Sequence, residues 1–129
     1  MVSSAVIHST VAAYFAATNA LDVDTYVNVF APDGVMHSPP GSPPITGWEA
    51  IRQVAQRLFA PYQAISATAE RVIVAGNGAG VVYTAHFTAH NGRTATVDGI
   101  DVFEVNDDGT IAVARYYWDP SPLQALLPA

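Results

Sequence analysis

Hydrophobic side chains recur at helical spacing near the start of the chain and at alternate positions in its second half. The first pattern forms one stripe, which consists of Val11, Tyr14, Phe15, Thr18 and Leu21. A stripe with this spacing is typical of a helix that buries one face, and Ser3 or Ser4 can cap its first turn. We therefore predict a helix from one of these serines to about Ala20.

Two shorter helices are predicted before the pattern changes. Asp22 or Asp24 is expected to cap a helix with the sequence TYVNVF, which ends at the turn APDG. A short extended piece, VMH, then leads into SPPGSPPITG, whose prolines exclude a helix. The third helix is predicted over Trp48–Phe59, with Thr46 as its cap and Glu49 completing a capping box.

After Pro61 the spacing of apolar residues becomes alternating, which is typical of strands that bury one face. The predicted strands cover residues 65–75, 80–90, 93–105 and 110–118, separated by the turn sequences GNG, NG and NDDG. Helices followed by an antiparallel meander indicate an α+β fold. We expect one domain, residues 1–129, in which three helices pack on a curved sheet and enclose a pocket.

The composition narrows the classes of function. The chain has 129 residues, a net charge of −6, scattered arginines and no lysine. Nucleic acid and anionic membrane surfaces are therefore poor partners, and a lysine base is excluded. Cysteine is absent, which excludes disulfides and thiolate nucleophiles.

The sequence also lacks the patterns of targeting and of cofactor binding. The N-terminal segment has no basic region, and we interpret it as a helix of the mature protein. No apolar run reaches the length that spans a membrane. The histidines and carboxylates have no spacing suited to a metal, and no glycine-rich phosphate loop is present. We expect a cytoplasmic protein without metal or cofactor.

One carboxylate occupies an unexpected position. In VDGIDVFEV the odd-numbered side chains form one strand face, which consists of Val97, Gly99, Asp101, Phe103 and Val105. A carboxylate buried in such a row is costly and usually keeps its proton. Either this strand face is exposed to solvent, or Asp101 has a catalytic or ligand-binding role.

Two segments resemble a known family. FAPDGVMHSPPGSPPITGWEAI is similar to the segment between the second and third helices of ketosteroid isomerases, and VDGIDVFEVNDDGTIAVARYYW is similar to their last two long strands. The chain is thus identified as a ketosteroid isomerase-like or SnoaL-like member of the nuclear-transport-factor-2-like superfamily. The resemblance implies a cone-shaped α+β barrel with an interior pocket.

The resemblance also implies roles for individual residues. Tyr14 and a protonated Asp101 would donate hydrogen bonds to an enolate, as in ketosteroid isomerase itself. The catalytic base of the family falls on Ser38, which has no basicity of its own, and two supporting tyrosines fall on Phe30 and Ala55. The ligand-binding positions implied by the family are Phe30, Val97, Gly99, Phe103, Tyr116 and Trp118.

His86 is the favoured substitute for the missing base, with His37 as its rival. The strand of His86 has an apolar opposite face, which consists of Val81, Tyr83, Ala85, Phe87 and Ala89. If that face is the core, His86 faces solvent; if the family register holds, His86 lines the pocket. We favour the family register, and the apolar row, with Ile100 and Val102, would then form the outer face of a homodimer.

Three functions fit these features. The favoured one is a steroid delta-isomerase-like enzyme that binds a small apolar carbonyl compound and stabilises its enolate. A non-catalytic binder of steroid-like or aromatic ligands and a polyketide cyclase-like enzyme are the alternatives. An epoxide hydrolase would need an Asp–Arg–Asp arrangement, which Arg115 does not clearly supply. In each case the expected partner is a small apolar ligand.

Overall fold

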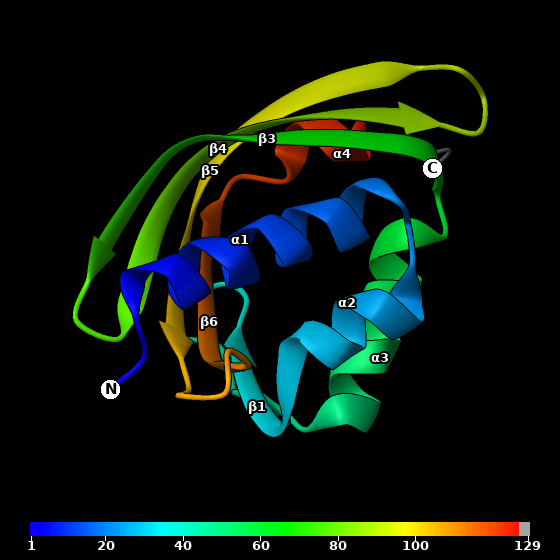
Figure 1. The fold of residues 1–129 in the computed structure, drawn as a ribbon. Coiled ribbons are helices and arrows are strands. Elements are labelled where there is room, and N and C mark those ends of the chain that lie inside the picture. The colour runs from blue at the N-terminus through cyan, green and yellow to red at the C-terminus, as the bar shows by residue number, and fades with distance from the viewer. Residues whose placement is uncertain (127–129) are drawn as a thin grey trace.

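The computed structural model describes residues 1–126 and shows helices packed on one curved sheet. In chain order the elements are α1 (Ser4–Asn19), α2 (Val23–Val29), β1 (Phe30–His37), β2 (Ile45–Thr46), α3 (Trp48–Phe59), β3 (Tyr62–Ala75), β4 (Gly78–Ala89), β5 (Thr94–Val105), β6 (Ile111–Trp118) and α4 (Ser121–Gln124). The strand order is β2-β1-β6-β5-β4-β3, and only β1 and β6 run parallel among these neighbours. The sheet curves around α1, with α2 and α3 at its open side (Figure 1). This arrangement confirms the predicted α+β cone.

The first two helices begin at side-chain caps. The Ser3 hydroxyl accepts a hydrogen bond from the Val6 amide at 3.2 Å, and the Asp22 carboxylate accepts one from the Thr25 amide at 3.1 Å. These caps satisfy amides that have no partner within the helix. The second helix begins at Val23, two residues before the predicted TYVNVF segment.

The third helix begins differently from the prediction, and the predicted capping box is wrong. Thr46 belongs to β2, where it pairs with Val35 of β1. The helix cap is Gly47, whose φ of 91° and ψ of 159° lie in a region that essentially only glycine adopts. Thr46 therefore takes part in strand pairing, and Gly47 makes the sharp turn into α3.

The inner face of β4 is the apolar row Val81, Tyr83, Ala85, Phe87 and Ala89, all of which are buried. His86 lies on the opposite face, is exposed, and its Nδ1 lies 2.8 Å from the Thr96 hydroxyl. The favoured register, which placed His86 in the pocket and this row outside, is wrong. The reason is the hydrophobic effect, because burying each large apolar side chain is worth about 1.5–3 kcal/mol.

The outer face of the sheet nevertheless carries apolar side chains. Val82 pairs with Ile100, and Ile100 pairs with Tyr117, so the three form a row across β4, β5 and β6. Their exposed fractions are 41%, 45% and 49%, and the nearby Ile73 is 53% exposed. We call these four residues the outer apolar patch.

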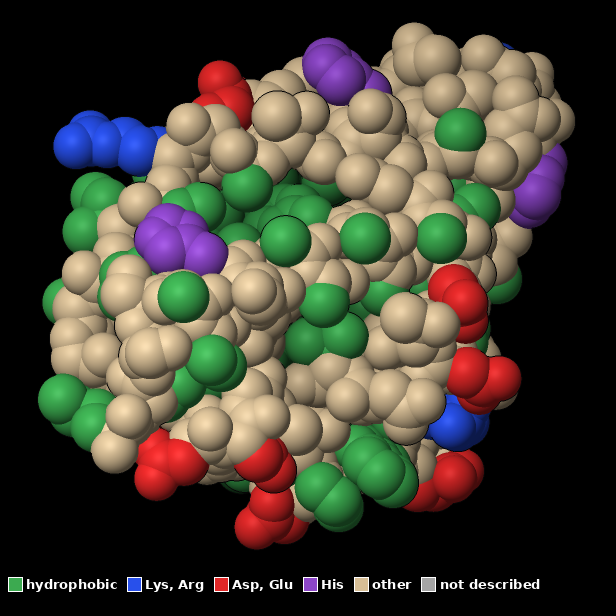
Figure 2. Space-filling view, viewed as in Figure 1, with side chains coloured by type: hydrophobic (Ala, Val, Ile, Leu, Met, Phe, Trp, Pro, Cys, Tyr) green, Lys and Arg blue, Asp and Glu red, His purple; other side chains and the backbone are tan. Residues whose placement is uncertain are grey.

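The charged side chains are sparse on the face that carries α1. Acidic side chains gather towards its lower and right edges, and the basic ones that it shows stand apart from one another (Figure 2). No helix within residues 1–126 is both long enough and apolar enough to cross a membrane.

Candidate active site

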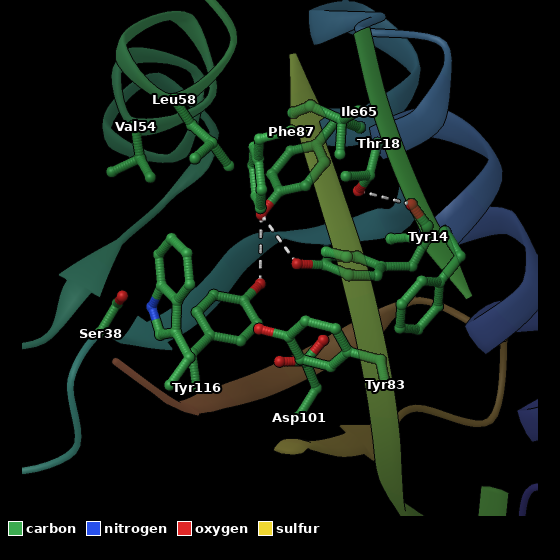
Figure 3. A pocket seen from close by; sticks show the side chains of 15 residues that line it. Tyr14, Thr18, Ser38, Val54, Leu58, Ile65, Tyr83, Phe87, Asp101 and Tyr116 are labelled. Carbon is green, nitrogen blue, oxygen red and sulfur yellow. Dashed lines mark hydrogen bonds between the residues drawn. The ribbon is translucent and has the colours of Figure 1, made fainter. Parts of the chain in front are cut away.

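A pocket lies between the helices and the inner face of the sheet. It contains about 660 Å³ of space free of protein atoms, part of which is open to solvent. Its polar side chains are Tyr14, Thr18, Tyr26, Ser38, Tyr83, Asp101 and Tyr116 (Figure 3). The other lining residues are apolar or aromatic, so the polar groups act in a medium of low dielectric constant.

Asp101 points into this pocket from β5 and is 4% exposed. Within residues 1–126 its carboxyl group forms no hydrogen bond, and its neighbours across the strands are Val81 and Tyr116. Burial raises the pKa of the Asp101 carboxyl to about 8. The unexpected acid of the sequence thus lies on a buried face, where desolvation favours its protonated form.

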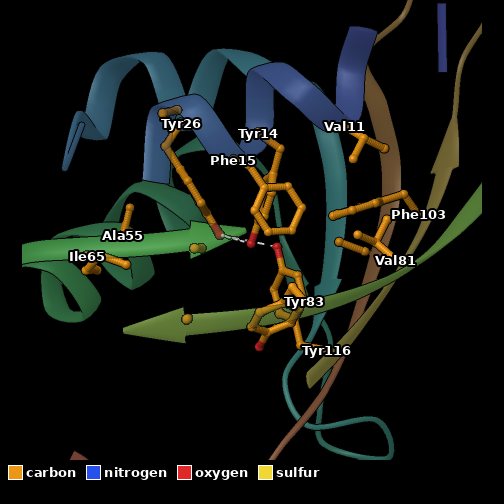
Figure 4. Close-up of a cluster of buried hydrophobic side chains, with 14 of the residues drawn as sticks. Val11, Tyr14, Phe15, Tyr26, Ala55, Ile65, Val81, Tyr83, Phe103 and Tyr116 are labelled. Atoms are coloured by element: carbon orange, nitrogen blue, oxygen red, sulfur yellow. Dashed lines mark hydrogen bonds between the residues drawn. The ribbon is translucent and has the colours of Figure 1, made fainter. Parts of the chain in front are cut away.

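Three tyrosine hydroxyls form a chain beside it. The Tyr26 hydroxyl lies 3.3 Å from that of Tyr14 and 3.2 Å from that of Tyr116 (Figure 4). Burial raises the pKa of the Tyr14 and Tyr116 hydroxyls well above the ordinary value, and that of Tyr26 to about 12. Three hydroxyls carry three protons and the two mutual bonds use two, so one proton remains for an outside acceptor.

Tyr26 was not predicted as a site residue. It lies on α2, which ends just before Phe30, and the side chains of both residues are buried. The rings are 5.7 Å apart. The family's supporting tyrosines are absent at Phe30 and Ala55, and Tyr26 and Tyr116 supply hydroxyls next to Tyr14 from other positions.

The predicted base positions contain no base within the pocket. Ser38, the position at which the resemblance placed the family's base, follows β1 and lines the pocket. His37 is partly buried and pairs with Arg115 in the sheet, but it is not among the lining residues. His86 lies on the outer face. Among the described lining residues, the only ionisable side chains are Asp101 and tyrosines.

Two of the six predicted ligand-binding residues, Tyr116 and Trp118, line the pocket. The other four stand behind its wall. Phe103 packs against Tyr14 with ring centres 5.0 Å apart, Phe30 packs against both Tyr14 and Tyr26, and Val97 is buried in the core. Gly99 lies beneath the ring of Tyr83, a lining residue that was not predicted because its row was placed outside.

The residues from 1 to 126 contain no group of three histidines or carboxylates that could hold a metal ion. The polar groups that line the pocket include an acid and several phenols, which can donate hydrogen bonds. Such donors stabilise negative charge that develops on a bound oxygen atom.

Comparisons with known proteins agree with this picture. A model of the SnoaL-like domain matches residues 11–114, so the chain belongs to the SnoaL-like family within the nuclear-transport-factor-2-like superfamily. The predicted membership is confirmed.

Two solved structures share the fold. One is SalBIII, an epoxide hydrolase/cyclase-like enzyme in pyran ring formation in polyether salinomycin; it is 22% identical, with a TM-score of 0.78 over 89% of this chain and 92% of that one. The other is Rv0760c from Mycobacterium tuberculosis in complex with estradiol-17β-hemisuccinate; it is 21% identical, with a TM-score of 0.78 over 91% of this chain and 96% of that one.

Proposed function

We propose that the protein binds a small apolar compound through a carbonyl or phenol oxygen and stabilises the corresponding enolate. The observation that carries this proposal is Asp101, a buried acid with no hydrogen-bond partner in residues 1–126 whose pKa is raised to about 8 by burial. A neutral carboxyl group in an apolar pocket is a strong donor to a developing oxyanion.

Tyr14 supplies the second donor in this proposal. Its hydroxyl belongs to the chain with Tyr26 and Tyr116, which has one proton to spare. If Tyr116 donates to Tyr26 and Tyr26 donates to Tyr14, the spare proton lies on Tyr14. Each bond in such a chain polarises the next and strengthens the final donor.

A proton-transfer enzyme also needs a base, and this is where the alternatives separate. A steroid delta-isomerase-like reaction removes a proton from carbon, which neither Ser38 nor a protonated Asp101 can do well. We therefore propose enolate stabilisation with weak isomerase activity at most. A non-catalytic binder of steroid-like or aromatic ligands is supported by the lack of a base among the described lining residues.

A polyketide cyclase-like activity would use the same donors, because ring closure through an enolate also develops charge on oxygen. The small ligands named with the two structural neighbours, a steroid ester and a polyether, support a pocket for small molecules in general. Because both neighbours are less than 25% identical to this chain in sequence, their ligands do not identify its substrate.

Calorimetric titration with estradiol-17β-hemisuccinate tests the proposal. We expect binding by the wild-type protein and about tenfold weaker binding by Asp101→Leu, because the phenol oxygen loses a donor. His86→Ala is the matched control. Its affinity should stay within about twofold of the wild-type affinity, because the His86 side chain lies on the outer face. No binding by the wild-type protein, or an equal loss in both variants, would contradict the proposal.

A further inference from the structure

Tyr83 presents a second polar group on the sheet wall of the pocket that has no partner among the described residues. The residue is 8% exposed and lines the pocket, and its hydroxyl forms no hydrogen bond within residues 1–126. In that part of the chain, every fully enclosed side-chain nitrogen or oxygen has a partner. The Tyr83 hydroxyl and the Asp101 carboxyl must therefore open into the pocket.

Gly99 determines where this hydroxyl lies. It stands directly opposite Tyr83 in the β4–β5 pairing, two residues before Asp101. A Cβ atom at position 99 would lie 2.4 Å from the Tyr83 hydroxyl oxygen and 2.6 Å from Cζ. The backbone of Gly99 needs no left-handed conformation, so what glycine provides here is space for the end of the Tyr83 ring. The end of the ring consequently lies over Gly99, and Figure 3 shows the Tyr83 ring beside the Asp101 carboxyl.

The pocket then contains three protons that have no acceptor within residues 1–126. They come from the Asp101 carboxyl, the Tyr83 hydroxyl and the spare proton of the tyrosine chain. A neutral carbonyl oxygen has two lone pairs and accepts two hydrogen bonds. One donor would therefore remain unpaired in an apolar pocket, which is unfavourable.

We infer that Tyr83 is a third ligand donor, placed by Gly99, and that the pocket selects compounds with two neighbouring oxygen atoms, of the 1,3-dicarbonyl class. Such a compound, or its enol, offers acceptors for all three donors. This inference rests on the proposed function, because it assigns the ligand class of the same pocket. In it Gly99 is a positioning residue that acts through Tyr83.

Two compounds with one carbon skeleton test the inference. They are 1-phenylbutane-1,3-dione, with two oxygens, and 1-phenylbutan-1-one, with one. We expect the wild-type protein to bind the dione about tenfold more tightly. Tyr83→Phe should reduce this preference to about twofold, because it should weaken the binding of the dione and not that of the monoketone. Asp101→Asn should weaken the binding of both compounds.

Gly99→Ala tests the positioning role. The added methyl group displaces the Tyr83 ring, so the dione preference should be lost as in Tyr83→Phe. Adding Gly99→Ala to Tyr83→Phe should then change the dione affinity by less than about twofold, since the two substitutions act through one hydroxyl. If Gly99→Ala fails to fold, Tyr83→Phe decides alone.

The outcomes separate the inference from the proposed function. Equal binding of the two compounds by the wild-type protein, or an equal loss for both in Tyr83→Phe, overturns the inference and leaves the proposed function intact. A melting temperature several degrees lower in Tyr83→Phe would show that the hydroxyl has a structural partner, and this too overturns it. If neither compound nor the phenolic steroid binds, both proposals are wrong.

Discussion

Asp101 is the residue whose ionisation should be visible in the stability of the whole protein. Its folded pKa is raised to about 8, whereas the unfolded carboxyl ionises near about 3.9. Between these values the folded state holds a proton that the unfolded state has released, so the free energy of unfolding falls as pH rises. The stabilisation is complete below about pH 4 and is lost by about pH 8.

Urea denaturation at pH 5, 7 and 9 measures this dependence, and Asp101→Asn should flatten it. Hydrogen bonds from Thr25, Thr110 and Ser121 lower the pKa of Asp22, Asp108 and Asp119, respectively. Those carboxylates stabilise the fold only above acidic pH and act in the opposite direction. The difference between wild type and Asp101→Asn therefore isolates one residue. A difference that does not change with pH would mean that Asp101 is ionised in the fold.

Ser38 is the second residue with a measurable consequence. A carboxylate base typically contributes about 10²–10⁴-fold to proton transfer. Ser38→Asp would place such a group on the pocket wall, and we expect the rate of 3-oxo-Δ5-steroid isomerisation to rise by at least an order of magnitude. The absorbance of the conjugated ketone product measures it.

Two further substitutions show whether the gain uses the proposed site. Asp101→Leu in the Ser38→Asp background should remove most of the gain, because the enolate loses a donor. His86→Ala in the same background should leave the rate unchanged. If Ser38→Asp yields no isomerisation while steroid still binds, the pocket geometry does not support this reaction.

Among the elements, α2 is short but joins others through Tyr26, whose hydroxyl contacts Tyr14 of α1 and Tyr116 of β6. Tyr26→Phe removes both hydrogen bonds from a buried site. We expect the free energy of unfolding to fall by about 1–3 kcal/mol, measured by urea denaturation. Tyr83→Phe serves as the control. It should change the free energy of unfolding little, because the Tyr83 hydroxyl has no partner in residues 1–126. Equal effects would mean that the tyrosine chain adds no stability.

The elements also show which patterns could be predicted from the sequence. Local signals narrowed each of the first two caps to two candidates that included Ser3 and Asp22, because a cap depends on residues three positions apart. The cap of α3 was mispredicted because Thr46 is held by a strand whose partner, Val35, lies eleven residues earlier. Pairing of that kind leaves no local signature.

The distinction between local signals and contacts of distant residues also holds for the site. The alternation in β4 was compatible with an apolar core face, and the family register overrode it, which misplaced both His86 and Tyr83. The four apolar or small neighbours of Asp101 on its strand left both a solvent-exposed and a buried face open, and the family resemblance favoured the buried one. Tyr26 was missed because a seven-residue helix has too few positions to define a face.

At the scale of the whole molecule, the outer apolar patch is the feature that needs a partner. Ile73, Val82, Ile100 and Tyr117 are each between 41% and 53% exposed, although they lie together on one face of the sheet. Large exposed apolar patches are uncommon on monomers and mark interaction surfaces. Of the residues first expected to form this face, the β4 row is buried inside and Ile100 is part of the patch. The homodimer through this face stays a prediction.

The patch is suited to a second copy of the same chain. A two-fold interface brings one surface against itself, so an uncharged centre avoids opposing like charges. The four patch residues carry no charge, and Arg115 nearby forms an ion pair with Glu104 at 2.8 Å. We therefore expect a dimer at tens of micromolar by light scattering, with Ile100 close to the centre of the interface.

Placing a charge on the patch tests this assembly. Ile100→Asp should convert the dimer to a monomer, because a carboxylate at the centre of an apolar interface would be desolvated without a partner. Val6→Asp is the matched control: it adds the same charge at an exposed valine of α1 and should leave the dimer unchanged. A wild-type monomer at these concentrations, or a dimer that survives Ile100→Asp, would show that the patch has another role. Since the pocket lies on the inner face of the same sheet, Ile100→Asp should also leave the affinity for estradiol-17β-hemisuccinate within about twofold.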